Sequence, residues 1–325
     1  MQKLLLSVSI ILAGLLFGYA IQRAVNRYHP AALPRIPGIR RTLQRIALLA
    51  LNPIAALGAI WVFQLDNLRI AFLPVLGVLT LVAGGSAGLV LGRALKLPPR
   101  KAGAFFAAGG MFNIGSIGAL IVFIFLGERG FALVPLFRLF EEFTYYAFGF
   151  PIAKSFSPLV RDAGGRRLRA ILLDPFVLVQ VGSISLGFAL NLLSVPRPEF
   201  YRHVNGVVIP IASFLLLVSI GLAMRFGSIR GYFRESLYVA GIKFLFVPAV
   251  VGTAAALLGM GTFDGGLPLA VIIVLSSMPV GFIALVPPSI YDLDVDLANA
   301  AWLVTTACLI VVIPLQMLIV QAIMP

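Results

Sequence analysis

The chain has 325 residues, of which 60% are hydrophobic and only 11% carry a charge, and its net charge at pH 7 is +13. A mean hydropathy of +1.04 lies far outside the range of soluble globular domains, so the composition excludes a soluble protein. A strongly basic chain can bind nucleic acid, but here lysine and arginine gather between apolar segments, as they do in membrane proteins. We therefore expect a lipid bilayer around the chain and no nucleic-acid partner.

Ten apolar segments recur along the chain, each near the roughly 20 residues that cross a hydrocarbon core of roughly 30 Å. They are residues 4–22, 43–64, 70–92, 103–126, 131–153, 172–193, 205–225, 235–259, 265–288 and 297–320. The sequence thus predicts an all-α integral membrane protein with ten transmembrane helices. The first segment has some features of a signal peptide, but basic residues follow it instead of preceding it, so we expect it to be retained.

Lysine and arginine are distributed unequally between the two sets of alternating loops. Eighteen lie in or beside the loops that share a side with the loop after the first segment, and five lie on the opposite side. Because cytoplasmic loops are enriched in these residues, both termini are predicted on the non-cytoplasmic side. We expect the protein in a bacterial inner membrane.

The ten segments divide into two halves of five. We expect a first repeat over residues 1–156, a basic cytoplasmic linker over residues 157–171 and a second repeat over residues 172–325. The tripeptide Pro-Ile-Ala at residues 53–55 of the second segment recurs at residues 210–212 of the seventh. Since an odd number of segments per half places the halves in opposite orientations, the sequence predicts a five-plus-five inverted repeat.

Two apolar segments in corresponding positions of the halves are interrupted. Residues 109–118 of the fourth segment read Gly-Gly-Met-Phe-Asn-Ile-Gly-Ser-Ile-Gly, and residues 276–281 of the ninth read Ser-Ser-Met-Pro-Val-Gly. Paired breaks are typical of a transporter binding site, because an unwound helix exposes backbone donors and acceptors and half-helix N-termini attract anions. The substrate-binding residues predicted in the two breaks are Asn113, Gly115, Ser116, Gly118, Ser276, Ser277, Pro279 and Gly281. Asn52, which precedes a proline in the second segment, is a further predicted binding residue.

The two breaks are expected to differ in sharpness. Pro279 removes a helix donor and clashes with the preceding turn, which costs about 3 kcal/mol. The first break is expected to depend on Asn113 and on Gly115 and Gly118, which weaken a helix by roughly 1 kcal/mol each relative to alanine. Glycine and serine also let membrane helices pack closely, so packing is the alternative role for residues such as Ser116.

The fifth segment carries a charged cluster at membrane depth. Arg138, Glu141 and Glu142 are three and four residues apart and would share one face of a continuous helix. Buried charges are expensive unless they pair or line an aqueous cavity, which makes the cluster a functional candidate. Arg138 could bind a carboxylate bidentately, and Glu141 or Glu142 could carry a coupling proton, while a structural salt bridge is the alternative. Lys243, in the eighth segment, is either a substrate counter-charge or a snorkelling residue.

Several motifs resemble the auxin efflux carrier family of permeases, within the superfamily that includes the bile-acid:sodium symporters. Residues 112–130 resemble its fourth span, where Asn-x-Gly-x-x-Gly precedes an apolar run and a Gly-acid-x-Gly turn. Residues 172–175 (Leu-Leu-Asp-Pro) resemble its entry to the sixth span, and residues 277–279 (Ser-Met-Pro) and 290–292 (Ile-Tyr-Asp) resemble its last two spans. Ala119 departs from the family, which commonly has proline there.

The resemblance covers nearly the whole chain and implies broken fourth and ninth helices that cross within the inverted repeat, a homodimer, and transport of small organic anions such as dicarboxylates. We therefore expect a secondary active transporter that works by alternating access without a cofactor, with proton coupling favoured over sodium. A sodium-coupled bile-acid-type symporter and a passive channel stay open, although the symporters' Glu-x-x-x-Gln-Asn-like ninth span is missing. An intramembrane enzyme is remote, because no histidine lies in an apolar segment and no nucleophile–base set is found.

Overall fold

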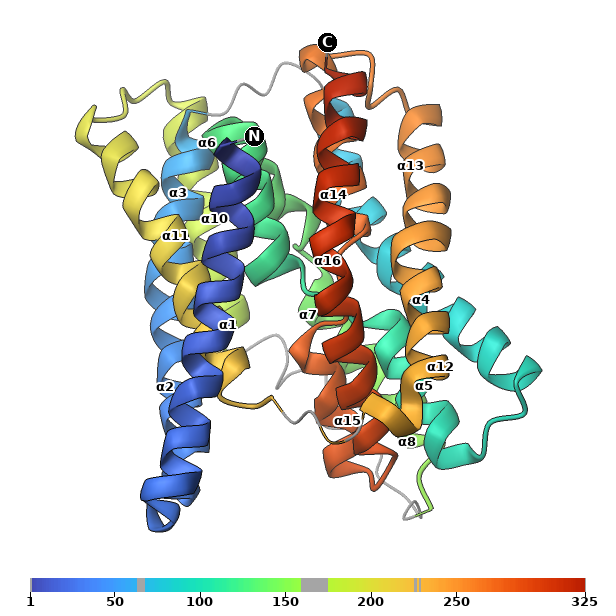
Figure 1. Cartoon of the computed structure of the whole chain (residues 1–325). Coiled ribbons are helices and arrows are strands. Elements are labelled where there is room, and N and C mark those ends of the chain that lie inside the picture. Colours follow the sequence, from blue (N-terminus) through green and yellow to red (C-terminus); the bar gives the residue numbers. More distant parts are fainter. Residues whose placement is uncertain (1, 63–67, 159–174, 225–226, 228, 325) are drawn as a thin grey trace. The chain divides into compact units, whose positions relative to one another are not determined.

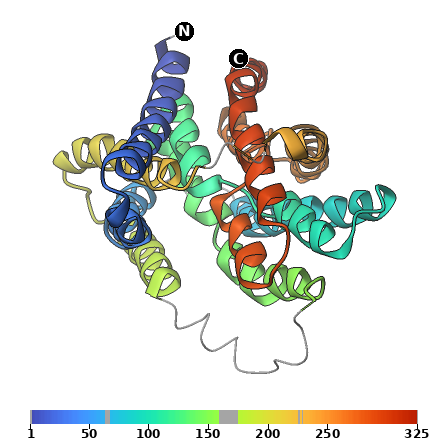
Figure 2. The same cartoon turned by 60° about the horizontal axis from the view of Figure 1, so that its bottom comes forward.

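The computed structural model describes residues 2–62, 68–158, 175–224, 227 and 229–324, and this part of the chain is almost entirely helical (Figure 1; Figure 2). No strand occurs among the described residues, and the sole β-type pairing there is an isolated antiparallel bridge between Phe112 and Val280. The predicted all-α class is confirmed. Apart from its first two residues, the predicted linker at 157–171 lies outside the described residues.

Seven helical stretches of the described residues are long and apolar enough to cross a membrane. They are Ser9–Tyr28, Pro30–Trp61, Leu68–Ala94, Ile114–Lys154, Phe200–Gly221, Ile229–Leu257 and Val295–Ile323. Val181–Leu192 and Asp264–Ser276 form shorter apolar helices. The longest stretch bends sharply at Gly127, whose φ of 69° is left-handed, between the predicted fourth and fifth segments. An integral membrane protein is supported, and the count of ten spans stays a prediction.

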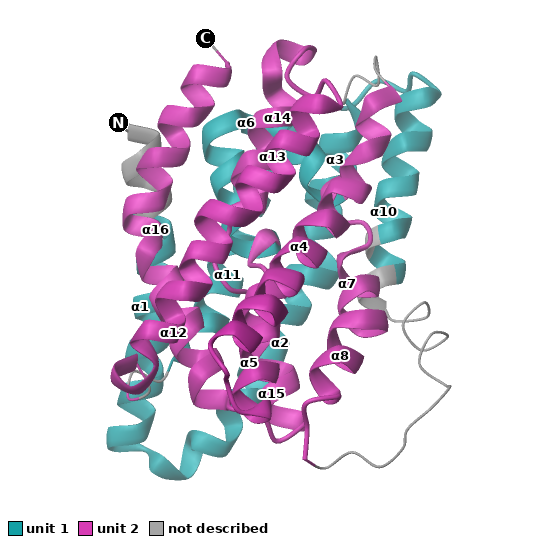
Figure 3. Ribbon diagram, turned by 90° about the vertical axis from the view of Figure 1, so that its right-hand side faces the viewer, with its two compact units in different colours: residues 1–66, 115–135, 174–224 teal, residues 67–114, 136–173, 225–325 magenta. Residues whose placement is uncertain are grey.

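The chain forms two compact units, which Figure 3 shows in teal and magenta. Unit 1 contains residues 1–66, 115–135 and 174–224, and unit 2 contains residues 67–114, 136–173 and 225–325. Each unit therefore combines segments from both predicted repeats. The units and the repeats divide the chain differently, and the repeat boundaries stay a prediction.

Unit 1 is built from helices that pack lengthwise. Its elements are α1 (Gln2–Tyr28), η1 (Pro30–Arg35), α2 (Ile36–Ile46), η2 (Ala47–Leu51), α3 (Asn52–Trp61), η4 (Ile114–Gly118), α6 (Ala119–Phe137, as far as Pro135), α10 (Pro175–Leu192) and α11 (Phe200–Gly221). Within the unit α1 packs along α11, and α3 packs along α10. Pro53 lies just after the π-helical turn η2, where the regular pattern of α-helical hydrogen bonds is interrupted. Ala47, Ala212 and Leu216 form a buried cluster between η2 and α11.

Unit 2 contains residues 109–114 of the first predicted break and the whole of the second. Its elements are η3 (Leu68–Phe72), α4 (Leu73–Ala94), α5 (Pro99–Gly110), α7 (Glu141–Thr144), η5 (Tyr145–Gly149), α8 (Phe150–Lys154), α12 (Ile229–Gly241), η7 (Ile242–Phe246), α13 (Val247–Leu257), η8 (Asp264–Gly266), α14 (Leu267–Ser276), η9 (Phe282–Leu285), α15 (Val286–Ile290) and α16 (Val295–Ile323). The helix α4 packs against α5, α13 against α14, and α12 beside α16 (Figure 1). Asp294 begins α16 as its N-cap by accepting a 2.9 Å hydrogen bond from the Leu297 amide.

The fifth predicted segment is not the continuous helix that its apolar run suggested. The α-helix α6 ends at Phe137, a turn occupies residues 138–140, and α7 begins at Glu141. In this turn the Glu141 amide donates to the Arg138 carbonyl at 2.8 Å, a shorter spacing than the α-helical one. Pro135 helps to end α6, because it removes a backbone donor from the last turn of this helix. Arg138 and the two glutamates therefore do not share the face of one continuous helix.

Candidate binding site at the two helix breaks

The first break lies immediately after α5. This helix ends at Gly110, and Met111 has extended backbone angles (φ −108°, ψ 124°). The chain becomes helical again with the π-helical turn η4, which contains Gly115 and Gly118. The interruption therefore precedes these two glycines and follows Gly109 and Gly110, because two consecutive poor helix formers end α5.

The second break lies where Pro279 predicts it. The helix α14 ends at Ser276, and Gly281 is extended (φ −75°, ψ 148°) before the short helices η9 and α15 begin. A helix commonly ends at or before the residue that precedes a proline, because that residue is driven out of the helical region. Proline chemistry thus accounts for the position of this break.

The two breaks cross and pair with each other inside unit 2. The Asn113 amide donates to the Pro279 carbonyl at 2.9 Å, and the Gly281 amide donates to the Met111 carbonyl at 3.0 Å. Phe112 and Val280 form the antiparallel bridge between these two bonds. Backbone groups that leave the helices thereby find partners without water, which a membrane interior requires.

The last helix, α16, supports the second break with two side chains. Thr305 Oγ1 accepts a 3.1 Å hydrogen bond from the Val280 amide. Gln316 donates to the Ser277 hydroxyl at 2.7 Å and to the Ser277 carbonyl at 3.2 Å. Neither Thr305 nor Gln316 is among the binding residues predicted from the sequence. Their spacing of eleven residues, three helical turns, was the available signal, because it places both on one face of an apolar helix.

A chain of polar side chains links the charged cluster to the first break. Arg138 forms an ion pair with the buried carboxylate of Glu141. The Tyr145 hydroxyl donates to Glu141 Oε1 at 3.0 Å and accepts from the Phe112 amide, also at 3.0 Å. Tyr145 was not predicted, although its position four residues after Glu141 placed it within reach. The ion pair is the contact that the structural alternative expects, and the substrate and proton roles of Arg138, Glu141 and Glu142 stay predictions.

Lys243 reaches the same break from the eighth segment. Its ammonium donates to the Met111 carbonyl at 2.9 Å and lies 3.0 Å from the centre of the Phe112 ring. The side chain is completely buried in unit 2. Snorkelling to the membrane surface therefore does not describe this lysine.

The other predicted binding residues are divided between the units. Ser276 is buried at the end of α14 and donates to the Ile273 carbonyl at 3.3 Å. Gly115, Ser116, Gly118 and Asn52 belong to unit 1, whereas the crossing belongs to unit 2. Asn113, Ser277, Pro279 and Gly281 are the predicted residues that the crossing itself brings together.

Two cavities in unit 2 are lined by described residues. An apolar one of about 100 Å³ lies beside the first break, and its lining includes Met111, Tyr145, Phe106 and Phe148. The second, of about 640 Å³, is charged, and its lining includes Arg100, Lys101, Tyr232, Asp292, Asp294 and Asp296. Arg100 and Asp292 form an exposed ion pair there at 2.6 Å. No group of three or more metal-binding side chains occurs among the described residues.

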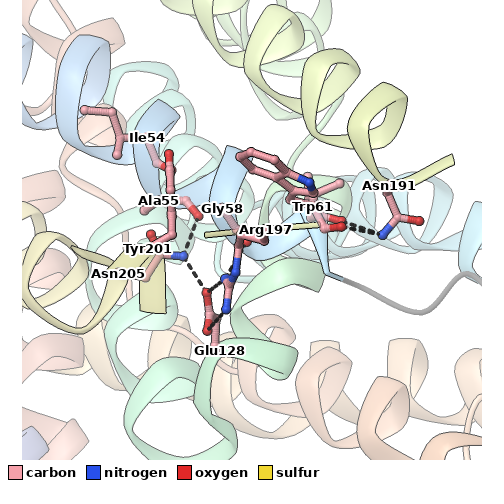
Figure 4. A network of polar contacts seen from close by, with 10 residues as sticks. Ile54, Ala55, Gly58, Trp61, Glu128, Asn191, Arg197, Tyr201 and Asn205 are labelled. Carbon is pink, nitrogen blue, oxygen red and sulfur yellow. Dashed lines mark hydrogen bonds and ion pairs between the residues drawn. The ribbon is translucent and has the colours of Figure 1, made fainter. Parts of the chain in front are cut away.

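A separate polar network lies in unit 1 (Figure 4). Glu128 pairs with Arg197 and accepts a 2.7 Å hydrogen bond from Asn205. Arg197 also donates to the Gly58 carbonyl at 2.7 Å, and Asn205 donates to the Ala55 carbonyl at 3.2 Å. The network joins α6, just after its kink at Gly127, to α3 and α11. Glu128 and Arg197 lie between the predicted apolar segments, and neither is among the site residues predicted from the sequence.

Two curated proteins are similar to most of the chain. An uncharacterized transporter of Methanothermobacter thermautotrophicus is 22% identical over 280 residues, which cover 84% of this chain and 87% of that protein. An uncharacterized transporter of Methanocaldococcus jannaschii is 27% identical over 256 residues, which cover 75% of this chain and 77% of that protein. The chain matches none of the protein families with which it was compared. The relatives and the apolar helices together support a membrane transporter.

Proposed function

We propose that this chain is a secondary active transporter of a small organic anion, most closely allied to the auxin efflux carrier type, with its substrate site at the crossing of the two breaks. The single observation that carries the proposal is the pairing of Met111–Asn113 with Pro279–Gly281 in unit 2. Crossed, interrupted helices bring helix ends and polar side chains to membrane depth, where a solute can be bound away from water.

A carboxylate is the substrate class that the site supports best. Two cationic side chains are associated with the first break. Lys243 contacts it directly through the Met111 carbonyl, and Arg138 is linked to it through Glu141 and Tyr145. Asn113 adds an amide at the crossing and is buried. Cationic groups together with amide donors match the charge and the hydrogen-bonding capacity of a carboxylate.

The packing in each unit favours the proposed inverted repeat. In unit 1 the first predicted span (α1) packs on the seventh (α11), and the sixth (α10) packs on the second (α3). In unit 2 the fourth (α5) packs on the tenth (α16), and the ninth (α15) packs on the fifth (α8). A twofold relation between the halves requires such reciprocal contacts, because each span has an equivalent five spans later. Alternating access by movement between the halves follows from such symmetry.

The test is a binding screen followed by transport. Purified protein is screened by thermal unfolding against lactate, succinate, malate and indole-3-acetate, because a ligand that binds the folded state raises the Tm. Uptake of each compound into proteoliposomes, with and without a proton gradient, then follows. Accumulation above the outside concentration supports a carrier. Equilibration without accumulation under every gradient contradicts active transport and favours a channel.

Arg138→Ala tests the predicted substrate contact, and Arg93→Ala is its matched control. Arg93 lies exposed in the last turn of α4, in the same unit. We expect Arg138→Ala to weaken carboxylate binding and Arg93→Ala to leave it unchanged. A carboxylate that stabilises the Arg138 variant as strongly as the unaltered protein would remove Arg138 from the binding site.

A further inference from the structure

Lys243 is an unusual cation for a membrane interior. It lies in the π-helical turn η7, between the α-helices α12 and α13, and none of its side chain is exposed. Short π-helical turns within longer helices occur frequently at functional sites. Among the described residues, the buried aspartate, glutamate, lysine and arginine side chains are those of Glu141 and Lys243. Glu141 has an arginine partner, whereas Lys243 has different contacts.

The ammonium of Lys243 lies at the carbonyl end of a half-helix. Met111 directly follows the last residue of α5, and its carbonyl accepts both from Lys243 at 2.9 Å and from the Gly281 amide at 3.0 Å. The C-terminal end of a helix carries negative partial charge, which attracts a cation. The Phe112 ring, 3.0 Å from the ammonium, presents the negative face of its π-system. The Met111 carbonyl, the C-terminal end of α5 and the Phe112 ring therefore all favour a positive charge at the position of the ammonium.

The structure records no ion pair between Lys243 and a carboxylate of the described residues. Three of the described carboxylates, those of Asp292, Glu141 and Glu128, each pair with an arginine instead. An ammonium has three donors, and in this structure one is directed to the Met111 carbonyl. A buried cation without a counter-ion is costly, so an anion that arrives beside it gains strongly.

We propose that Lys243 is a built-in cation of the binding site, so that carboxylate binding and transport need no sodium ion. Interrupted helices in transporters commonly coordinate sodium through unwound carbonyls and half-helix C-termini. Here the ammonium holds that position and would repel a second cation. The same ammonium supplies the counter-charge for the substrate. This inference rests on the proposed function, since it names the cation requirement of that same site.

The first experiment uses sodium itself as the probe. Unaltered protein is unfolded thermally in sodium chloride and in N-methyl-D-glucamine chloride at equal ionic strength. We expect the same Tm in both salts at every concentration, because no sodium ion binds the folded state. A sodium-specific rise of the Tm with concentration would be the signature of a bound ion and would overturn the inference.

The second experiment measures uptake of lactate, succinate, malate and indole-3-acetate as their N-methyl-D-glucamine salts. We expect equal initial rates with and without sodium for the compounds that are carried. An uptake rate that depends on sodium overturns the inference about Lys243 but leaves the proposed transport function in place. Failure to carry any of the four in either medium counts against the proposed function, while the unfolding experiment still decides the role of Lys243.

Variants of Lys243 test the counter-charge. Lys243→Met keeps much of the side-chain volume without the charge, and we expect it to weaken carboxylate binding about 10- to 100-fold, as the loss of a hydrogen bond to a charged group would. Lys243→Arg retains the charge and should bind more tightly than Lys243→Met. Lys101→Met removes a lysine of α5 outside the crossing and should bind as the unaltered protein does. A folded Lys243→Met protein with unchanged carboxylate affinity overturns the proposal.

Discussion

Gly281 lies directly against the carbonyl group of Phe112: a Cβ atom at position 281 would be 2.5 Å from the Phe112 oxygen and 2.8 Å from its carbon. Both neighbours are backbone atoms of the opposite break, so neither can rotate away. The glycine therefore permits the close approach that the two breaks require.

Gly281→Ala should destabilise the protein and reduce transport, because the added methyl group forces the breaks apart. Overpacking of this kind typically costs about 1–3 kcal/mol. The Tm of the purified variant and its uptake rate measure the two effects. Gly241→Ala is the control, since a Cβ at Gly241 would meet no atom within 4 Å. Equal Tm values for Gly281→Ala and Gly241→Ala would show that the close contact between Gly281 and the Phe112 carbonyl does not contribute to stability.

Tyr145→Phe should weaken the connection between the charged cluster and the first break. The substitution removes the hydroxyl that donates to Glu141 and accepts from the Phe112 amide. A buried donor or acceptor left without a partner costs about 1–3 kcal/mol, so a lower Tm is expected. Tyr28→Phe, at an exposed tyrosine, is the comparison. An unchanged Tm in both would mean that the Phe112 amide gains nothing from Tyr145.

The Glu128–Arg197 pair should stabilise unit 1. Arg197→Met removes the guanidinium that holds Glu128 and the Gly58 carbonyl, and we expect a loss of about 1.5–3 kcal/mol, the usual contribution of hydrogen bonds to charged groups. Thermal unfolding measures this loss. The control is Arg100→Met, because the Arg100–Asp292 pair is about half exposed and such pairs contribute about 0–1 kcal/mol. Similar losses of Tm in the two variants would contradict the larger stabilising role given to the Glu128–Arg197 pair.

Glu141→Gln and Glu142→Gln separate a proton-coupling role from a structural one. If a glutamate carries the coupled proton, uptake into proteoliposomes rises as the outside pH falls, and the glutamine variant loses that dependence. Glu141 is also the partner of Arg138 and Tyr145, so its variant should lower the Tm as well. Uptake with unchanged pH dependence in both variants would remove both residues from coupling.

The sequence predicted both interrupted stretches because proline and glycine act locally, but it assigned the first break to the wrong glycines, since Gly115 and Gly118 lie in the helical turn η4 that follows the break. Pro279 ends α14 through its own backbone chemistry, and no distant contact is needed. The hydrogen bonds of Tyr145, Thr305 and Gln316 were harder to anticipate, since each joins segments that are far apart in the sequence. The turn at residues 138–140 was missed for a related reason: the apolar run through it is equally compatible with a continuous helix.

Thr305 supports the second break through one hydroxyl, and a matched neighbour makes its contribution measurable. Its oxygen accepts from the Val280 amide at 3.1 Å, while the Thr306 hydroxyl donates only within its own helix, to Trp302. Thr305→Val leaves the Val280 amide without this acceptor, which should cost about 1–3 kcal/mol, whereas Thr305→Ser keeps the bond. Thr306→Val should change the Tm little, because hydroxyl bonds to the preceding helical turn stabilise weakly. Equal Tm values for Thr305→Val and Thr306→Val would show that Val280 does not depend on Thr305.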